Sequence, residues 1–113
     1  MKTKEMIEKE LKEALQTKKD VEMANKLGIT YPNSEVLLDK GIAVIDYYTR
    51  FVMKLEAKPR MYLIMVLLNG IPMKDCAKRL CVTYAWMCTN YNKAIRELVN
   101  LVNEYEGSKS YKE

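Results

Sequence analysis

Small polar and basic side chains share one face of a predicted helix that begins near Tyr84. Their spacing of three and four residues matches the helical period, so we expect them to lie on one side. Such groups can contact base edges in a major groove. Asn92 could hydrogen-bond adenine, and Thr89 or Ala85 could contact a thymine methyl group. The basic members can pair with phosphates. The face comprises Ala85, Cys88, Thr89, Asn92, Lys93 and Arg96.

The opposite face of this helix is apolar and is expected to be buried. A second apolar stripe makes the face wider than one contact needs, which indicates packing on the N-terminal helix or on a second subunit. The first stripe comprises Tyr84, Met87, Tyr91, Ala94, Leu98, Leu101 and Tyr105, and the second comprises Cys88, Ile95, Val99 and Val102.

The residues before this helix predict the elements that would position it. An apolar stretch at 60–68 predicts a helix enclosed by its neighbours. The Asn-Gly pair after it predicts the end of that helix, because glycine adopts a positive φ without steric cost. Pro72 fits the first position of a second, short helix. Residues 80–83 then predict a turn, in which Thr83 is the expected N-cap of the long helix.

Several residues between 59 and 94 recur at the spacings of a known motif. They are Pro59, Arg60, Gly70, Asp75, Cys76, Ala77, Leu80, Cys81, Val82, Thr83, Lys93 and Ala94. With these residues in this order, the stretch 58–98 resembles the helix-turn-helix by which bacterial sigma factors bind the upstream promoter element. It is similar also to small sigma-like regulators of phages and mobile elements. The resemblance implies a transcriptional regulator that acts at promoters beside RNA polymerase.

Two residues depart from the family pattern. Cys81 replaces the turn glycine, so a left-handed backbone there would cost roughly 1 kcal/mol. Trp86 stands where the family has a small hydroxyl or a polar residue. Its large ring could contact the DNA backbone, or it could pack on another protein.

Two sets of side chains would face DNA if the N-terminal turns of the long helix enter the major groove. Residues 58–98 hold seven Lys and Arg against two Asp and Glu. This local excess favours a surface that faces phosphates, although the same cations could simply solvate exposed helices. The base-facing set is Thr83, Tyr84, Ala85, Cys88, Thr89 and Asn92, and the phosphate-facing set is Lys74, Lys78, Arg79, Lys93 and Arg96.

Residues 1–57 predict helices that support this unit. An amphipathic helix is expected over 2–16 and a shorter one over 20–27, opened by a capping box that starts at Thr17. The segment 20–30 weakly resembles a second helix-turn-helix. Pro32, however, follows its turn too closely for a recognition helix to continue from it. We therefore expect this segment mainly to support the fold.

The most apolar helix is predicted from Asn33 or Ser34 to about residue 56, and its composition predicts a central place in the fold. Gly41 inside it indicates a close helix contact. The aromatic cluster at 47, 48 and 51 could stack on bases, but core packing is the stronger interpretation. The helix-turn-helix unit with its extended C-terminal helix is predicted over 58–106, and residues 107–113 are predicted to form a flexible tail.

Composition argues against catalysis, because the chain of 113 residues has no histidine, phosphate loop or nucleophile motif. No cofactor or metal is expected, and Cys76, Cys81 and Cys88 should stay free thiols. The N-terminus is charged rather than signal-like, and no apolar run reaches membrane-spanning length. These features predict a cytoplasmic protein without a membrane partner.

The sequence thus predicts one compact all-α domain of about five to six helices containing a helix-turn-helix. The function it favours is sequence-specific binding of double-stranded DNA by a transcriptional regulator of a phage or mobile element, with a second copy of the chain as a candidate partner in a homodimer. A second hypothesis is a protein-interaction module that binds RNA polymerase or a sigma factor without contacting bases. A third is a DNA-binding protein similar to a phage terminase small subunit.

Overall fold

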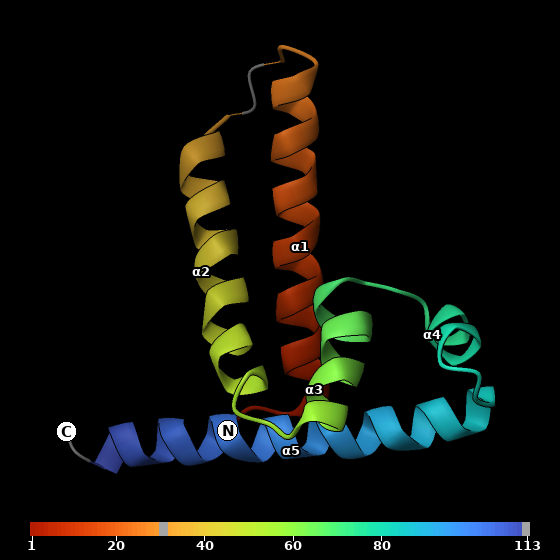
Figure 1. Cartoon of the computed structure of the whole chain (residues 1–113). Coiled ribbons are helices and arrows are strands. Elements are labelled where there is room, and N and C mark those ends of the chain that lie inside the picture. The colour runs from red at the N-terminus through yellow and green to blue at the C-terminus, as the bar shows by residue number, and fades with distance from the viewer. Residues whose placement is uncertain (30–31, 112–113) are drawn as a thin grey trace.

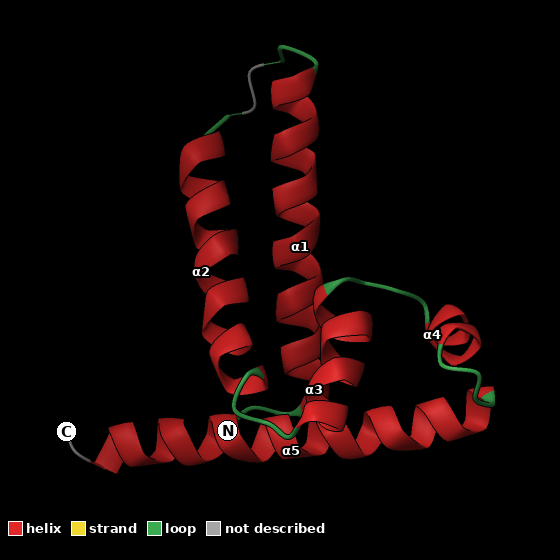
Figure 2. Cartoon of the chain, viewed as in Figure 1, coloured by secondary structure: helices red, strands yellow, loops and turns green. Residues whose placement is uncertain are grey.

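The computed structural model describes residues 1–29 and 32–111, and these ranges contain helices and no strand (Figure 2). The predicted all-α fold is therefore confirmed. In chain order the elements are α1 (Lys4–Lys26), α2 (Ser34–Val52), α3 (Ala57–Leu63), the π-helical segment η1 (Ile64–Leu68), α4 (Met73–Arg79) and α5 (Tyr84–Tyr111).

Helices α1 and α2 form an antiparallel hairpin that rises from α5, and α5 lies across the base of the molecule (Figure 1). Helix α3 stands beside the hairpin at this junction, whereas α4 lies near the N-terminal end of α5. The shape is flat, with extents of 45, 43 and 21 Å. The helices thus meet mainly at the base of the hairpin, and its far half projects from the body.

The main core lies where the base of the hairpin meets α3, η1 and α5. Burying these apolar side chains removes them from water and supplies the main stabilisation of the fold. Helix α4 contributes little to this core, because it buries only two short side chains. The cluster comprises Ile7, Leu11, Tyr48, Phe51, Val52, Tyr62, Leu63, Leu67, Cys76, Ala77, Met87, Tyr91, Ala94, Ile95, Leu98 and Val102.

Helix α1 is continuous, so the predicted break near Thr17 and the separate helix over 20–27 are wrong. A side-chain hydrogen bond of 2.9 Å from Gln16 Nε2 to Asp20 Oδ1 spans the expected break. Such a contact one turn apart supports the helix where a capping box was predicted. The helix begins instead after Thr3, whose Oγ1 accepts a hydrogen bond from the Met6 N–H at 3.3 Å.

Residues 20–29 are the end of α1 followed by the start of the hairpin loop. Gly28 takes a left-handed conformation with φ of 69°, as expected for a glycine after a helix. Thr30, the last residue of the weak second helix-turn-helix pattern, lies outside the described residues. The next helix begins at Ser34 and returns beside α1 (Figure 1).

Helix α2 is not central, contrary to its apolar composition, and it ends at Val52 rather than near residue 56. It contacts mainly α1, and its first half leaves Val36 and Ile42 exposed. Gly41 does mark a close helix contact, because a Cβ there would lie 3.2 Å from the carbonyl oxygen of Ala14. Tyr48 and Phe51 are buried at the base of α2, and Tyr47 is half-buried and edge-on to both rings, which confirms the predicted packing role of this cluster.

The helix predicted over 60–68 begins earlier, at Ala57, and is π-helical from Ile64. Two further boundaries in the second half of the chain differ from expectation. Pro72 lies just before α4, in an extended conformation with ψ of 142°, rather than at the first helical position. Helix α5 continues through Gly107 to Tyr111, so the predicted helix end at Gly107 is wrong. Glycine disfavours a helix interior but does not prohibit it, and the helix before it is long and well packed.

Candidate nucleic-acid interface

A tight turn joins α4 to the first turn of α5. Cys81 has a φ of 56°, so of the two turn geometries open at this position the left-handed one is present. Val82 donates a backbone hydrogen bond of 3.0 Å to the Ala77 carbonyl oxygen. Thr83 caps α5, because its Oγ1 accepts a 3.1 Å hydrogen bond from the Trp86 N–H. The predicted cap is thus confirmed, and α5 is fixed to α4 at its N-terminal end.

The face of α5 that packs on the body is apolar, as its periodicity predicted. The first stripe is buried only in its middle, because Tyr84 is 58% exposed and Tyr105 46% exposed. Tyr84, assigned both to this stripe and to the base-facing set, is therefore not a core residue. The fully covered members of both stripes are Met87, Tyr91, Ala94, Ile95, Leu98 and Val102.

The other flank of α5 presents most of the predicted base-facing side chains to solvent. Thr83, Ala85, Thr89 and Asn92 are exposed, whereas Cys88 is only half-buried. Cys88 therefore lies between the core face and this flank. The neighbouring Cys88 side chain raises the pKa of Tyr84, which is 58% exposed one turn before it on α5.

The predicted phosphate-facing cations are all exposed. They come from two elements, α4 and α5, that meet at the turn. Among the side chains described in residues 1–29 and 32–108 the one ion pair joins Lys2 to Glu10, so these five cations have no carboxylate partner there. Their charges are therefore available to a ligand. The set is Lys74, Lys78 and Arg79 on α4 with Lys93 and Arg96 on α5.

Trp86 packs on the protein itself. Its ring lies edge-on to Tyr62 of α3, with 5.8 Å between ring centroids and an interplanar angle of 89°. It is nevertheless 42% exposed, and Met61 and Tyr84 are other large exposed side chains on α3 and α5. The ring thus closes the junction of α3 and α5 while leaving part of its surface open to a partner.

Asn92 has a partner that the sequence did not suggest. Lys4 Nζ, from the first turn of α1, donates a hydrogen bond of 2.9 Å to Asn92 Oδ1. The two residues are 88 positions apart, and no local pattern connects them. Beside this contact lies a hollow of about 340 Å³ lined by Lys4, Asn92, Ile95, Arg96 and Val99.

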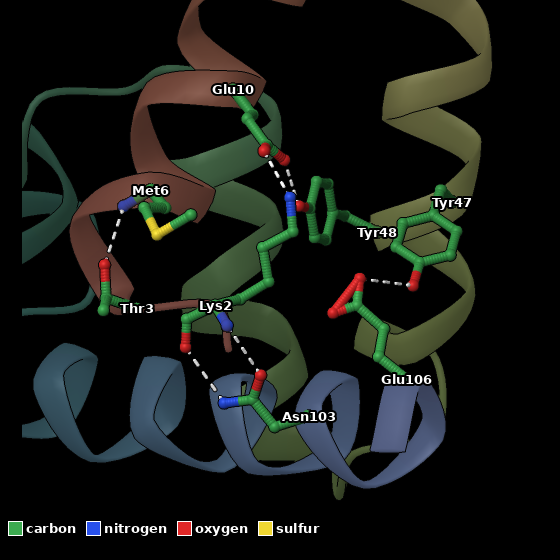
Figure 3. Close-up of polar contacts among 8 residues, drawn as sticks. All are labelled: Lys2, Thr3, Met6, Glu10, Tyr47, Tyr48, Asn103 and Glu106. Carbon is green, nitrogen blue, oxygen red and sulfur yellow. Dashed lines mark hydrogen bonds and ion pairs between the residues drawn. The ribbon is translucent and has the colours of Figure 1, made fainter. Parts of the chain in front are cut away.

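The N-terminal segment is held against α5 by a two-way hydrogen bond (Figure 3). The Lys2 N–H donates to Asn103 Oδ1 at 2.8 Å, and Asn103 Nδ2 donates to the Lys2 carbonyl oxygen at 2.9 Å. This pair fixes the segment that leads into α1, and so it places Lys4 beside the exposed flank of α5.

A polar cluster joins the base of the hairpin to α5 (Figure 3). Tyr48 donates a hydrogen bond to Glu10, which also pairs with Lys2, and Tyr47 donates one of 3.2 Å to Glu106. Burial raises the pKa of Glu10, but the hydrogen bonds from Lys2 and Tyr48 outweigh it and lower that pKa overall. Burial and then the Glu106 charge raise the pKa of Tyr47 to about 12.

The cysteines are free thiols in the structure, as expected. Cys76 lies on the buried face of α4, and burial raises the pKa of its thiol. Among the described residues no group of three or more His, Cys, Asp or Glu side chains could hold a metal ion. The same part of the chain contains no helix with both the length and the apolar character to cross a membrane.

Comparison of the chain with protein-family models, with curated proteins and with solved structures gives no match.

Proposed function

We propose that this chain binds double-stranded DNA through the exposed flank of α5. The observation that carries the proposal is the pairing of two faces on one helix. One face is buried in the core, and the other presents short polar side chains beside cations that lack carboxylate partners in the described residues. A helix attached in this way can enter a major groove, where short polar groups meet base edges and flanking cations meet phosphates.

The resemblance of residues 58–98 to the sigma-factor helix-turn-helix supports a more specific role. In that role the chain recognises one DNA sequence and regulates transcription at promoters, beside RNA polymerase in the cytoplasm. A small regulator encoded by a phage or mobile element fits this proposal. Association as a homodimer would place two copies of α5 on two half-sites.

A second candidate function is protein binding through the same end of the molecule. It is favoured by the exposed surfaces of Tyr84 and Trp86 in the first turn of α5 and of Met61, the α3 residue next to the Tyr62 that contacts Trp86. Aromatic and methionine side chains are enriched in protein interfaces. RNA polymerase or a sigma factor would be the partner in this case.

Selection from a random duplex library with the purified full-length chain, at near-physiological salt, tests the first proposal. We expect one enriched motif. A palindromic motif would indicate, in addition, that the chain binds as a two-fold dimer. Recovery of no motif above background would refute sequence-specific binding. In that case, loss of polymerase or sigma-factor retention in Trp86→Ala, but not in Arg79→Ala, would support the second function.

A further inference from the structure

The first turn of α1 adds a cation to the exposed flank of α5. Lys4 reaches Asn92 at 2.9 Å, and Arg96 lines the same hollow one turn further along α5. Neither Lys4 nor Arg96 forms an ion pair with a described residue. The hollow therefore combines two positive charges with one amide group.

The polar atoms at this hollow are almost all hydrogen-bond donors. Lysine and arginine side chains have donors and no acceptor. The one side-chain acceptor, Asn92 Oδ1, is already bonded to Lys4, which leaves Asn92 Nδ2 as a further donor. A group of donors with two positive charges is complementary to an anion that has several acceptor oxygens, such as a phosphate.

The same contact opposes the expected role of Asn92 in adenine recognition. A bidentate contact to adenine uses both the oxygen and the nitrogen of the asparagine amide. Lys4 occupies the oxygen, and the Lys2–Asn103 hydrogen bonds hold the N-terminal segment in place. Adenine would therefore have to displace Lys4, whereas a phosphate could bond both residues as they stand.

We infer that Lys4, Asn92 and Arg96 bind a phosphodiester group of the duplex. This inference rests on the proposed function and specifies its surface. The DNA-binding surface then includes the first turn of α1 as well as α4 and α5. Asn92 contributes affinity for the backbone and does not select a base.

Salt dependence of duplex binding by the full-length chain tests this assignment, with Lys4→Ala compared with Lys9→Ala. Lys9 is an exposed lysine of α1, five residues from Lys4, and its loss changes the net charge equally. The logarithm of the association constant falls with the logarithm of salt concentration by about 0.9 per phosphate contact. We expect Lys4→Ala to make this slope shallower by about 0.9 and Lys9→Ala to leave it unchanged. Equal slopes for Lys4→Ala and the wild type would overturn the inference.

Asn92→Ala separates backbone binding from base recognition. We expect it to weaken binding to every duplex by a similar factor and to leave the selected motif unchanged. Relaxed preference at a single adenine position, with the salt slope intact, would overturn the inference but support the proposed function. No duplex binding by the wild type would overturn both.

Inorganic phosphate distinguishes a site for the DNA backbone from one for free phosphate. At matched ionic strength, we expect phosphate to weaken duplex binding no more than chloride does. A larger loss with phosphate that disappears in Lys4→Ala would identify free phosphate as the ligand, and would overturn the assignment to DNA.

Discussion

Tyr91 and Glu8 join the proposed recognition helix to the first helix of the chain. The Tyr91 hydroxyl donates a hydrogen bond of 2.7 Å to Glu8 Oε2, across 83 residues of sequence. Tyr91 is buried, and its burial followed by the hydrogen bond to Glu8 raises the pKa of the phenol. The position of α5 relative to α1 thus depends on a polar contact as well as on apolar packing.

Tyr91→Phe removes this hydrogen bond while preserving the ring. Because Glu8 is half-buried and can regain water, we expect the free energy of unfolding to fall by only about 1 kcal/mol. Urea denaturation measures the change. Tyr105→Phe is the matched control, since Tyr105 is nearly half exposed and its hydroxyl makes no hydrogen bond to the described residues. An equal loss in both variants would contradict the assigned role of the Tyr91 hydroxyl.

Alkaline pH should weaken the junction between α2 and α5 through Tyr47. Its pKa is about 12 in the folded chain against an ordinary value of 10.0. The unfolded chain therefore loses the proton first, so the stability that this group contributes is complete below pH 10.0 and is lost as pH rises toward 12. We expect the unfolding free energies of the wild type and Tyr47→Phe to converge over this interval. A difference that stays constant between pH 9 and 12 would contradict the prediction.

The local signals in residues 58–98 were sufficient to predict a helix before Gly70, then α4, the turn and the start of α5, but not the start of α3 at Ala57 or the π-helical segment after it. Each signal there is short-range: a stop after an apolar run, an N-cap at Thr83, and a glycine-like position at Cys81. The course of α1 and α2 was harder to predict, because composition suggested that α2 is central. Its apolar side chains instead pack on α1 in a projecting hairpin, and Val36 stays exposed. Such placement depends on contacts between distant segments.

The same distinction applies to the candidate interface. Periodicity predicted which face of α5 is buried, and it placed Thr89 and Arg96 on the exposed flank, as observed. It could not predict the contribution of Lys4, because Lys4 and Asn92 are 88 positions apart and no local pattern connects them. Tyr84 was assigned to the core wrongly, because apolar periodicity along α5 does not show how far along this helix the other helices cover it.

Gly41 and Gly107 are both helical but have opposite environments. A Cβ at Gly41 would lie 3.2 Å from the Ala14 carbonyl oxygen, whereas one at Gly107 would meet nothing within 4 Å. We expect Gly41→Ala to lower the unfolding free energy by about 1 kcal/mol, because overpacking against backbone exceeds the gain in helix propensity. Gly107→Ala should raise it by about 0.5 kcal/mol, since only the propensity gain remains near a helix end. Stabilisation by both substitutions would mean that α1 and α2 are further apart than described.

Cys81 carries backbone strain at the start of the proposed recognition helix. Its φ of 56° favours glycine. Cys81→Gly should therefore raise the unfolding free energy by about 0.5 kcal/mol, because the relief of strain exceeds the added entropy of the unfolded chain. Cys81→Ala is the control and should have little effect, since it retains a Cβ and removes only an exposed thiol. Thermal unfolding compares the two, and a lower Tm for the glycine variant would contradict this account of the turn.

Arg79 tests the proposed phosphate contacts on α4. It is exposed next to the turn, without a carboxylate partner among the described residues. We expect Arg79→Ala to weaken binding to all duplexes alike and to make the salt slope shallower by about 0.9, because one phosphate contact is lost. The control is Arg50→Ala, which removes an exposed arginine near the C-terminal end of α2. Fluorescence anisotropy at several salt concentrations measures both slopes. If Arg50→Ala changed the slope as much as Arg79→Ala, binding would depend on net charge alone, and the assignment of α4 to the DNA surface would fail.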